Sequence, residues 1–61
     1  MTDEELRKEL QNTVQESGMT DIEIARLIMI SRPTVTRWRD GTNSAHPIMI
    51  PSIIKKIKKG K

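Results

Sequence analysis

The chain contains no cysteine, tyrosine or phenylalanine, and its only aromatic residue is Trp38. Without cysteine, neither a disulfide framework nor a thiolate metal site can form. The only histidine, His46, stands beside Pro47 and is interpreted as a loop residue, and no glycine-rich phosphate loop is present. The carboxylates fall at helix starts or on exposed faces, without the spacing of a paired acid and base. We therefore expect no catalytic residue, no metal site and no cofactor, and the protein is not expected to be an enzyme.

Long apolar runs are also absent. The longest covers residues 27–30 and is far shorter than the ~20 residues that span a bilayer. The first residues are acidic and lack the basic-then-apolar pattern of a secretion signal. We expect a cytoplasmic protein of a prokaryote or its phage, without membrane association. Residues 1–61 make one domain of a size at which a single core is only marginally sufficient, so a partner chain would add stability.

Charge is divided unevenly along the chain. Residues 1–30 hold seven acids against three bases, a net charge of −4, whereas residues 31–61 hold eight bases against one acid, a net charge of +7. The lysines of the last segment are typical of a solvated helix face, and they can also strengthen attraction to phosphate. This uneven distribution of charge indicates that the second half of the chain binds a polyanion.

Local signals predict where three helices begin. Thr2 with Glu5, and Thr20 with Glu23, have the spacing of a capping box, in which each side chain satisfies a free amide at the helix start. Ser31 repeats the cap without the glutamate. Each start has an apolar staple across its first turn: Met1 with Leu6, Met19 with Ile24, and Ile30 with Val35.

Glycine and proline predict where the helices end. All three glycines follow a helical stretch, where a residue with positive φ can end a helix without steric cost: Gly18, Gly41 and Gly60. The signals together predict helices over about 3–16, 21–28 and 32–39, and a fourth that ends near Lys59. Its start stays open, because Pro51 can occupy a first turn or residues 48–50 can be extended.

Helical periodicity predicts a core shared by all four helices. Apolar residues recur three and four apart on one face of each segment. The predicted core is Leu6, Leu10, Val14, Ile24, Ala25, Ile28, Val35, Trp38, Ile50, Ile53, Ile54 and Ile57. The fold class is therefore all-α, a small bundle of four helices, within a range of three to five.

Residues 19–47 resemble the Cro and repressor class of phage and bacterial helix-turn-helix regulators. The residues that carry the resemblance are Ile24, Ala25, Ile28, Ile30, residues 31–38 and Gly41. The resemblance implies a lambda-repressor-like fold, with the motif at about 20–41 and a C-terminal helix and basic tail at about 48–61. It also implies a sequence-specific transcriptional regulator, a Cro-like phage repressor that binds operator DNA.

Two residues depart from the pattern of that family. Met29 stands where the family usually has glycine in the turn, which predicts a positive φ at a cost of about 1 kcal/mol or slightly more. Asp21 stands where the family often has a glutamine that touches phosphate, and its carboxylate would repel one. Phosphate contact there would rest on backbone amides or on Thr20, if its capping role permits.

Helix geometry predicts which residues face DNA. With Val35 and Trp38 inward, the outward set is Pro33, Thr36, Arg37 and Asp40, and Arg32 and Thr34 lie on the flanks near the N-terminal end. The expected base contacts are Arg32, Pro33, Thr36 and Arg37. Both arginines are expected to donate to guanine, while Thr36 or Pro33 meets a thymine methyl. Phosphate contacts are expected from Thr20, Thr34, Arg39, Thr42, Asn43 and Ser44.

The expected partner is a near-palindromic operator bound by a homodimer. One such module reads few base pairs, so two copies on half-sites ~10 bp apart are typical. The candidate interface is Ile48, Met49 and Ile50, with the alternative that these residues only close the core. No small-molecule ligand is expected, and repression by occupancy is favoured because no effector domain fits. Two alternatives remain: an antitoxin of a toxin–antitoxin pair, and a protein-interaction adaptor that does not bind DNA.

Overall fold

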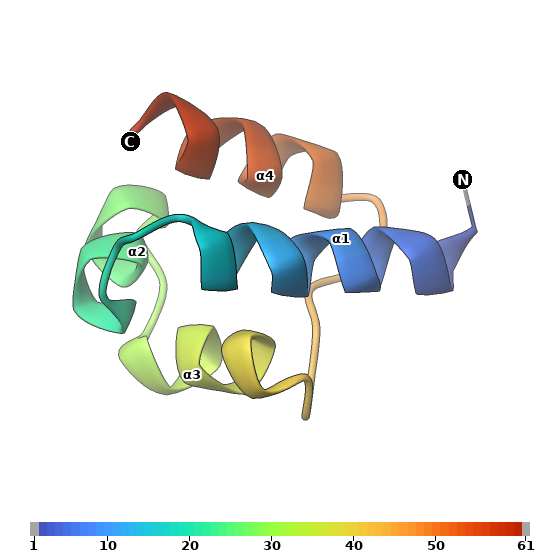
Figure 1. The fold of residues 1–61 in the computed structure, drawn as a ribbon, viewed down its shortest axis with the longest axis horizontal. Coiled ribbons are helices and arrows are strands. Elements are labelled where there is room, and N and C mark those ends of the chain that lie inside the picture. The colour runs from blue at the N-terminus through green and yellow to red at the C-terminus, as the bar shows by residue number, and fades with distance from the viewer. Residues whose placement is uncertain (1, 61) are drawn as a thin grey trace.

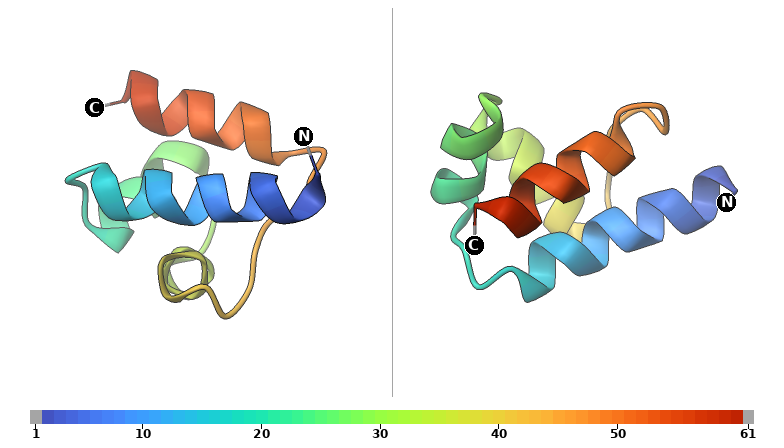
Figure 2. Two further views of the ribbon diagram at one scale, coloured as in Figure 1. Left: turned by 45° about the vertical axis from the view of Figure 1, so that its right-hand side comes forward. Right: turned by 90° about the horizontal axis from the view of Figure 1, so that it is seen from above.

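The computed structural model describes residues 2–60, which form four helices and no strand. They are α1 (Asp3–Glu16), α2 (Asp21–Ile28), α3 (Arg32–Asp40) and α4 (Ile50–Lys59). The predicted bounds are confirmed, with α3 one residue longer than expected. Helix α1 lies in the middle, with α4 on one side and α3 on the other, while α2 closes one end against both (Figure 1). The left view of Figure 2 shows the same order, and the view from above shows α4 in front of α3 with α1 beside them.

The capping signals differ in how far they are realised. At Thr20 the capping box is complete: Glu23 N donates to Thr20 Oγ1 at 3.2 Å and Thr20 N donates to Glu23 Oε1 at 3.0 Å. Thr2 makes only the first of these bonds, from Glu5 N at 3.2 Å. The expectation for Ser31 is wrong in detail, because its hydroxyl pairs with Thr34 Oγ1 at 2.7 Å and caps no amide. Of the three staples, the one from Met1 lies outside the described residues.

Two of the three glycines have the expected positive φ. Gly18 and Gly41 have φ of 74° and 78°. Gly60 differs, with a φ of −80°. Its lack of a side chain has another effect, since a Cβ there would lie 2.5 Å from Leu27 Cδ2. The glycine thus lets the end of α4 approach α2.

The predicted core is confirmed with few changes. Nine predicted residues from all four helices are buried: Leu10, Val14, Ile24, Ala25, Val35, Trp38, Ile50, Ile54 and Ile57. Leu6, Ile28 and Ile53 are half-buried against them, joined by Met19, Ile30 and Ala45. Ser17 is the one buried polar residue of the described chain; its hydroxyl donates to Val14 O and accepts from Met19 N.

The start of α4 resolves the alternative left open by the sequence. Residues 47–49 form a turn, in which Met49 N donates to His46 O at 2.8 Å, and Pro51 lies in the first turn of α4. Residues 48–50 are therefore not an extended segment. Within residues 2–60, no helix is both long enough and apolar enough to cross a membrane.

Candidate nucleic-acid interface

A three-residue connection, residues 29–31, joins α2 to α3. Met29 has φ 59° and ψ 49°, the left-handed conformation predicted for it, and its amide donates to Ala25 O. Ile30 N also donates to Ala25 O, at 2.9 Å. The Met29 side chain is 91% exposed, so the residue pays the conformational cost without gaining burial.

The outer face of α3 brings the four predicted base-contact residues together. Val35 and Trp38 are buried on its inner face, whereas Arg32, Pro33 and Arg37 are exposed and Thr36 is partly exposed. These last four line one open depression on the surface. Their spacing explains this, because positions three or four residues apart lie on the same side of a helix, as do Arg32 with Thr36 and Pro33 with Arg37. The surface offers two guanidinium groups, one hydroxyl and one apolar ring.

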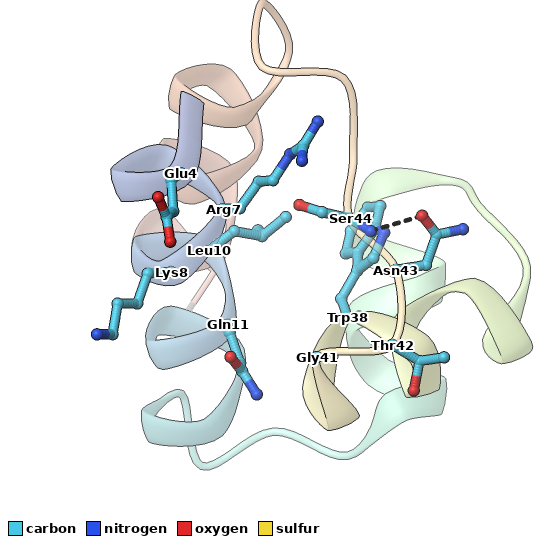
Figure 3. Close-up of a pocket in the computed structure, with 10 residues that line it drawn as sticks. All are labelled: Glu4, Arg7, Lys8, Leu10, Gln11, Trp38, Gly41, Thr42, Asn43 and Ser44. Carbon is cyan, nitrogen blue, oxygen red and sulfur yellow. Dashed lines mark hydrogen bonds between the residues drawn. The ribbon is translucent and has the colours of Figure 1, made fainter. Parts of the chain in front are cut away.

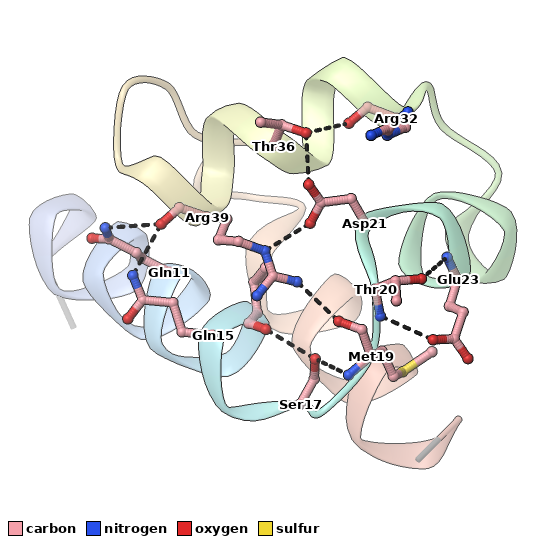
Figure 4. Close-up of polar contacts among 11 residues, drawn as sticks. Gln11, Gln15, Ser17, Met19, Thr20, Asp21, Glu23, Arg32, Thr36 and Arg39 are labelled. Carbon is pink, nitrogen blue, oxygen red and sulfur yellow. Dashed lines mark hydrogen bonds and ion pairs between the residues drawn. The ribbon is translucent and has the colours of Figure 1, made fainter.

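Asp21 joins the first turn of α2 to two turns of α3. Its Oδ1 accepts from Arg39 Nε and its Oδ2 accepts from Thr36 Oγ1, both at 2.7 Å (Figure 4). The hydrogen bond from Thr36, and then the hydrogen bond and charge of Arg39, lower the pKa of Asp21 below its ordinary value of 3.8. The carboxylate is thus ionised at neutral pH. Its repulsion of a phosphate, expected from the sequence, is offset by the guanidinium beside it.

Arg39 therefore differs from its expected role. The sequence predicts a phosphate contact, but Arg39 Nε binds Asp21 and Arg39 Nη2 donates to Met19 O at 2.9 Å. The guanidinium is held within the molecule because Asp21 offers a charged partner at a fixed distance. The Arg39 carbonyl in turn accepts from Gln11 Nε2 at 3.3 Å and from Gln15 Nε2 at 3.0 Å. Arg39 is thus a junction between α1, α2 and α3.

Sequence reasoning missed this junction. Asp21 and Arg39 are 18 residues apart, and Gln11 lies 28 residues from Arg39. No periodicity within one helix relates such positions. The one signal in the sequence was Asp21, an acid at a position where a phosphate contact was expected. A carboxylate at such a position indicates that a basic side chain lies nearby.

The remaining residues predicted to contact phosphate differ in exposure. Thr20, Thr42 and Asn43 are exposed, although Thr20 Oγ1 already accepts the capping bond from Glu23 N. Thr34 is half-buried and pairs with Ser31. The prediction for Ser44 is wrong in this structure: its hydroxyl oxygen is buried and has no hydrogen-bond partner. The Ser44 amide is also engaged, because Asn43 Oδ1 accepts from Ser44 N at 2.8 Å (Figure 3).

Residues 41–44 also form one wall of a groove against the first half of α1. The groove has a volume of about 490 Å³. Its lining combines opposite charges with the apolar surface of the core: Glu4, Arg7, Lys8, Leu10, Gln11, Trp38 and residues 41–44 (Figure 3). Because acid and base lie side by side, this groove does not have the single sign of charge typical of a phosphate track.

The predicted dimer segment divides into exposed and buried parts. Ile48 is 81% exposed and Met49 is 54% exposed, whereas Ile50 is fully buried. Ile50 is therefore corrected from an interface residue to a core residue, because its side chain belongs to the buried cluster that all four helices share. The alternative that this segment only closes the core holds for Ile50 and not for its two neighbours.

The acidic residues 1–30 and the basic residues 31–61 do not occupy two separate halves of the folded molecule. Helices α3 and α4 both belong to the basic half, yet in Figure 1 α4 lies above α1 and α3 lies below it. The exposed lysines of α4 are therefore separated from the arginines of α3. These lysines are Lys55, Lys56, Lys58 and Lys59.

No family model, no curated protein and no solved structure matches this chain. Across residues 2–60, no group of three acidic, histidine or cysteine side chains is arranged to hold a metal ion. The geometry of α2, α3 and their connection is therefore what bears on function.

Proposed function

We propose that this protein is a sequence-specific DNA-binding regulator of the helix-turn-helix class, with α3 as its recognition helix. The observation that carries the proposal is the gathering of Arg32, Pro33, Thr36 and Arg37 around one open depression on the face of α3 opposite its buried residues. A helix with this face free can enter the major groove, which is wide enough to admit it.

Roles follow from the chemistry of each exposed group. The guanidinium groups of Arg32 and Arg37 can each donate two hydrogen bonds to O6 and N7 of guanine. The exposed Thr42 and Asn43 follow α3 and can contact phosphates, which position a protein without reading sequence. The amides of the first turn of α2 offer a further phosphate contact, with Asp21 neutralised by Arg39.

The proposed active form is a homodimer on a near-palindromic operator, associated through Ile48 and Met49. Both side chains are exposed, and a single α3 helix reads too few base pairs for a specific site. Bound in this way, the protein would repress transcription by occupying the promoter. This function requires a cytoplasmic location, where prokaryotic DNA lies.

The test is in vitro selection from randomised duplex DNA. Wild-type protein is compared with Arg37→Ala and with Lys55→Ala, which removes the same charge from α4 on the other side of α1. We expect a near-palindromic site from wild type and from Lys55→Ala. Arg37→Ala should lose preference for one guanine in each half-site, by about 1–3 kcal/mol.

Salt dependence gives a second readout. A dimer that neutralises ~6–10 phosphates should lose about three to five decades of affinity between ~50 and ~200 mM salt. Failure of the folded wild type to enrich any site, together with a flat salt response, would reject DNA binding. It would favour an adaptor that uses the apolar residues Ile48 and Met49 for protein contact. A selected operator together with a bound toxin would instead identify an antitoxin.

A further inference from the structure

The hydrogen of the Thr36 hydroxyl is committed inside the protein. Thr36 Oγ1 lies 2.7 Å from Asp21 Oδ2 and 3.2 Å from Arg32 O (Figure 4). A hydroxyl carries one hydrogen and two acceptor lone pairs, and both of these neighbours can only accept. The shorter bond, to a carboxylate, is the charge-assisted and stronger one. The hydrogen therefore points to Asp21, and the hydroxyl presents only lone pairs elsewhere.

Asp21 is itself held in place for this task. Its other oxygen accepts from Arg39 Nε at 2.7 Å, and Arg39 is fixed by a second bond to Met19 O. A carboxylate anchored by a guanidinium can neither rotate away nor release its hold on the Thr36 hydrogen without breaking the ion pair. Thr36 is thus preorganised before any ligand arrives.

Thr36 also lines the same open depression as Arg32, Pro33 and Arg37. Its free lone pairs therefore belong to the surface that is proposed above to face the bases. In the major groove, adenine and cytosine offer an amine donor, whereas guanine and the O4 of thymine offer acceptors.

We propose that Asp21 is a positioning residue that makes Thr36 an acceptor-only reader, selective for the exocyclic amine of adenine or cytosine. This inference rests on the proposed function. An unconstrained threonine can serve donor and acceptor bases alike. With its hydrogen committed, Thr36 would set lone pair against lone pair at guanine O6 or thymine O4. Arg32 and Arg37, which can only donate, would read guanine beside it.

In vitro selection with Thr36→Val tests this directly. Valine keeps the shape and one methyl group but has no acceptor. We expect wild type to prefer adenine or cytosine at one position of each half-site, and Thr36→Val to lose that preference by about five-fold, the net worth of one hydrogen bond. Preference for thymine through a methyl contact would survive this change, so the two roles of Thr36 are distinguishable.

Asp21→Ala tests the positioning role. Without the carboxylate, only the longer bond to Arg32 O restrains the hydrogen, so guanine or thymine should become acceptable at the position that Thr36→Val identifies. Thermal unfolding of each variant is measured first. Should Asp21→Ala be unfolded, Asp21→Asn replaces it, because its amide group can donate to Thr36 Oγ1 and so release the hydroxyl hydrogen for guanine or thymine.

The outcomes separate this inference from the proposed function. No enriched site with folded wild type would reject DNA binding itself. An operator in which Thr36→Val relaxes no position, or relaxes one that holds guanine or thymine, would leave DNA binding intact and overturn the acceptor assignment. If a folded Asp21 variant still selects only adenine or cytosine at the position that Thr36→Val identifies, the role of Asp21 is overturned.

Discussion

Met29 is the only described residue other than glycine with a positive φ, and its side chain is not buried in that conformation. Its φ of 59° costs an L side chain about 1 kcal/mol or more, while its side chain is 91% exposed. Met29 adopts this conformation because the short connection between α2 and α3 requires a left-handed residue at that position. The hydrogen bond from Ile30 N to Ala25 O, at 2.9 Å, depends on the same geometry.

We therefore expect Met29→Gly to stabilise the protein. Relief of the strain is partly offset by the greater freedom of glycine in the unfolded chain, which leaves a net gain of about 0.5 kcal/mol in the free energy of unfolding. Urea denaturation followed by circular dichroism measures it. The matched control is Met29→Ala, which removes the same exposed side chain but keeps Cβ. Equal stability of the two variants would show that φ strain is not the cause.

At the scale of elements, the Asp21 junction couples the start of α2 to α3. The complete capping box at Thr20 shapes that first turn, and the Gln11 and Gln15 amides tie the end of α3 to α1. Three helices therefore share one polar cluster beside the apolar core. The orientation of the outer face of α3 depends on this cluster as well as on Val35 and Trp38.

The lowered pKa of Asp21 makes this coupling sensitive to acid. A carboxyl whose pKa is lower in the folded state adds stability above its unfolded pKa, and that stability is lost as the pH falls through the folded value. We expect the free energy of unfolding to decline as the pH falls below Asp21's ordinary value of 3.8. Asp21→Asn should be less stable than wild type at pH 7, with the difference shrinking towards pH 2.

Thermal unfolding across that pH range measures the difference. The pKa of Glu23 is also lowered, by the amide and hydroxyl of Thr20, and subtraction of the Asp21→Asn curve removes its contribution. Asp40→Asn, which removes the charge of an exposed acid at the end of α3, is the control for loss of one carboxylate. A constant difference between wild type and Asp21→Asn would assign the effect to something other than titration of Asp21.

At the scale of the whole molecule, the exposed pair Ile48 and Met49 stands out on a chain of only 61 residues. A turn holds them outward while the next residue, Ile50, enters the core. Their exposure supports association of two copies. Burial of one isoleucine contributes about 1.5–3 kcal/mol, and a two-fold interface buries each residue twice.

Ile48→Ser should therefore weaken self-association without unfolding the protomer. We expect the dimer dissociation constant to rise by about 100-fold or more, measured by sedimentation equilibrium with and without operator DNA. Ile22→Ser, which changes a 44% exposed isoleucine on α2, is the control and should leave association unchanged. A wild type that is monomeric even on the operator would reject the homodimer.

Much of this architecture is readable from local residues. Capping threonines, glycines and prolines act within one helical turn, so the bounds of α1 and α2 follow directly from them. Helical periodicity likewise predicts which face of α3 is buried, and hence which face carries Arg32 and Arg37. The positive φ of Met29 was expected from the resemblance stated above, because the resembled family usually has glycine at that position.

The sequence by itself thus determined the helices, their apolar faces and the outward set on α3, because each depends on residues a few positions apart. Only the tertiary structure decided what happens between helices. Packing of α2 against α3 brought Asp21 to Arg39 and turned that arginine inward, and the turn before α4 buried Ile50 beside an exposed Ile48. These outcomes depend on distances between elements, which no local pattern specifies.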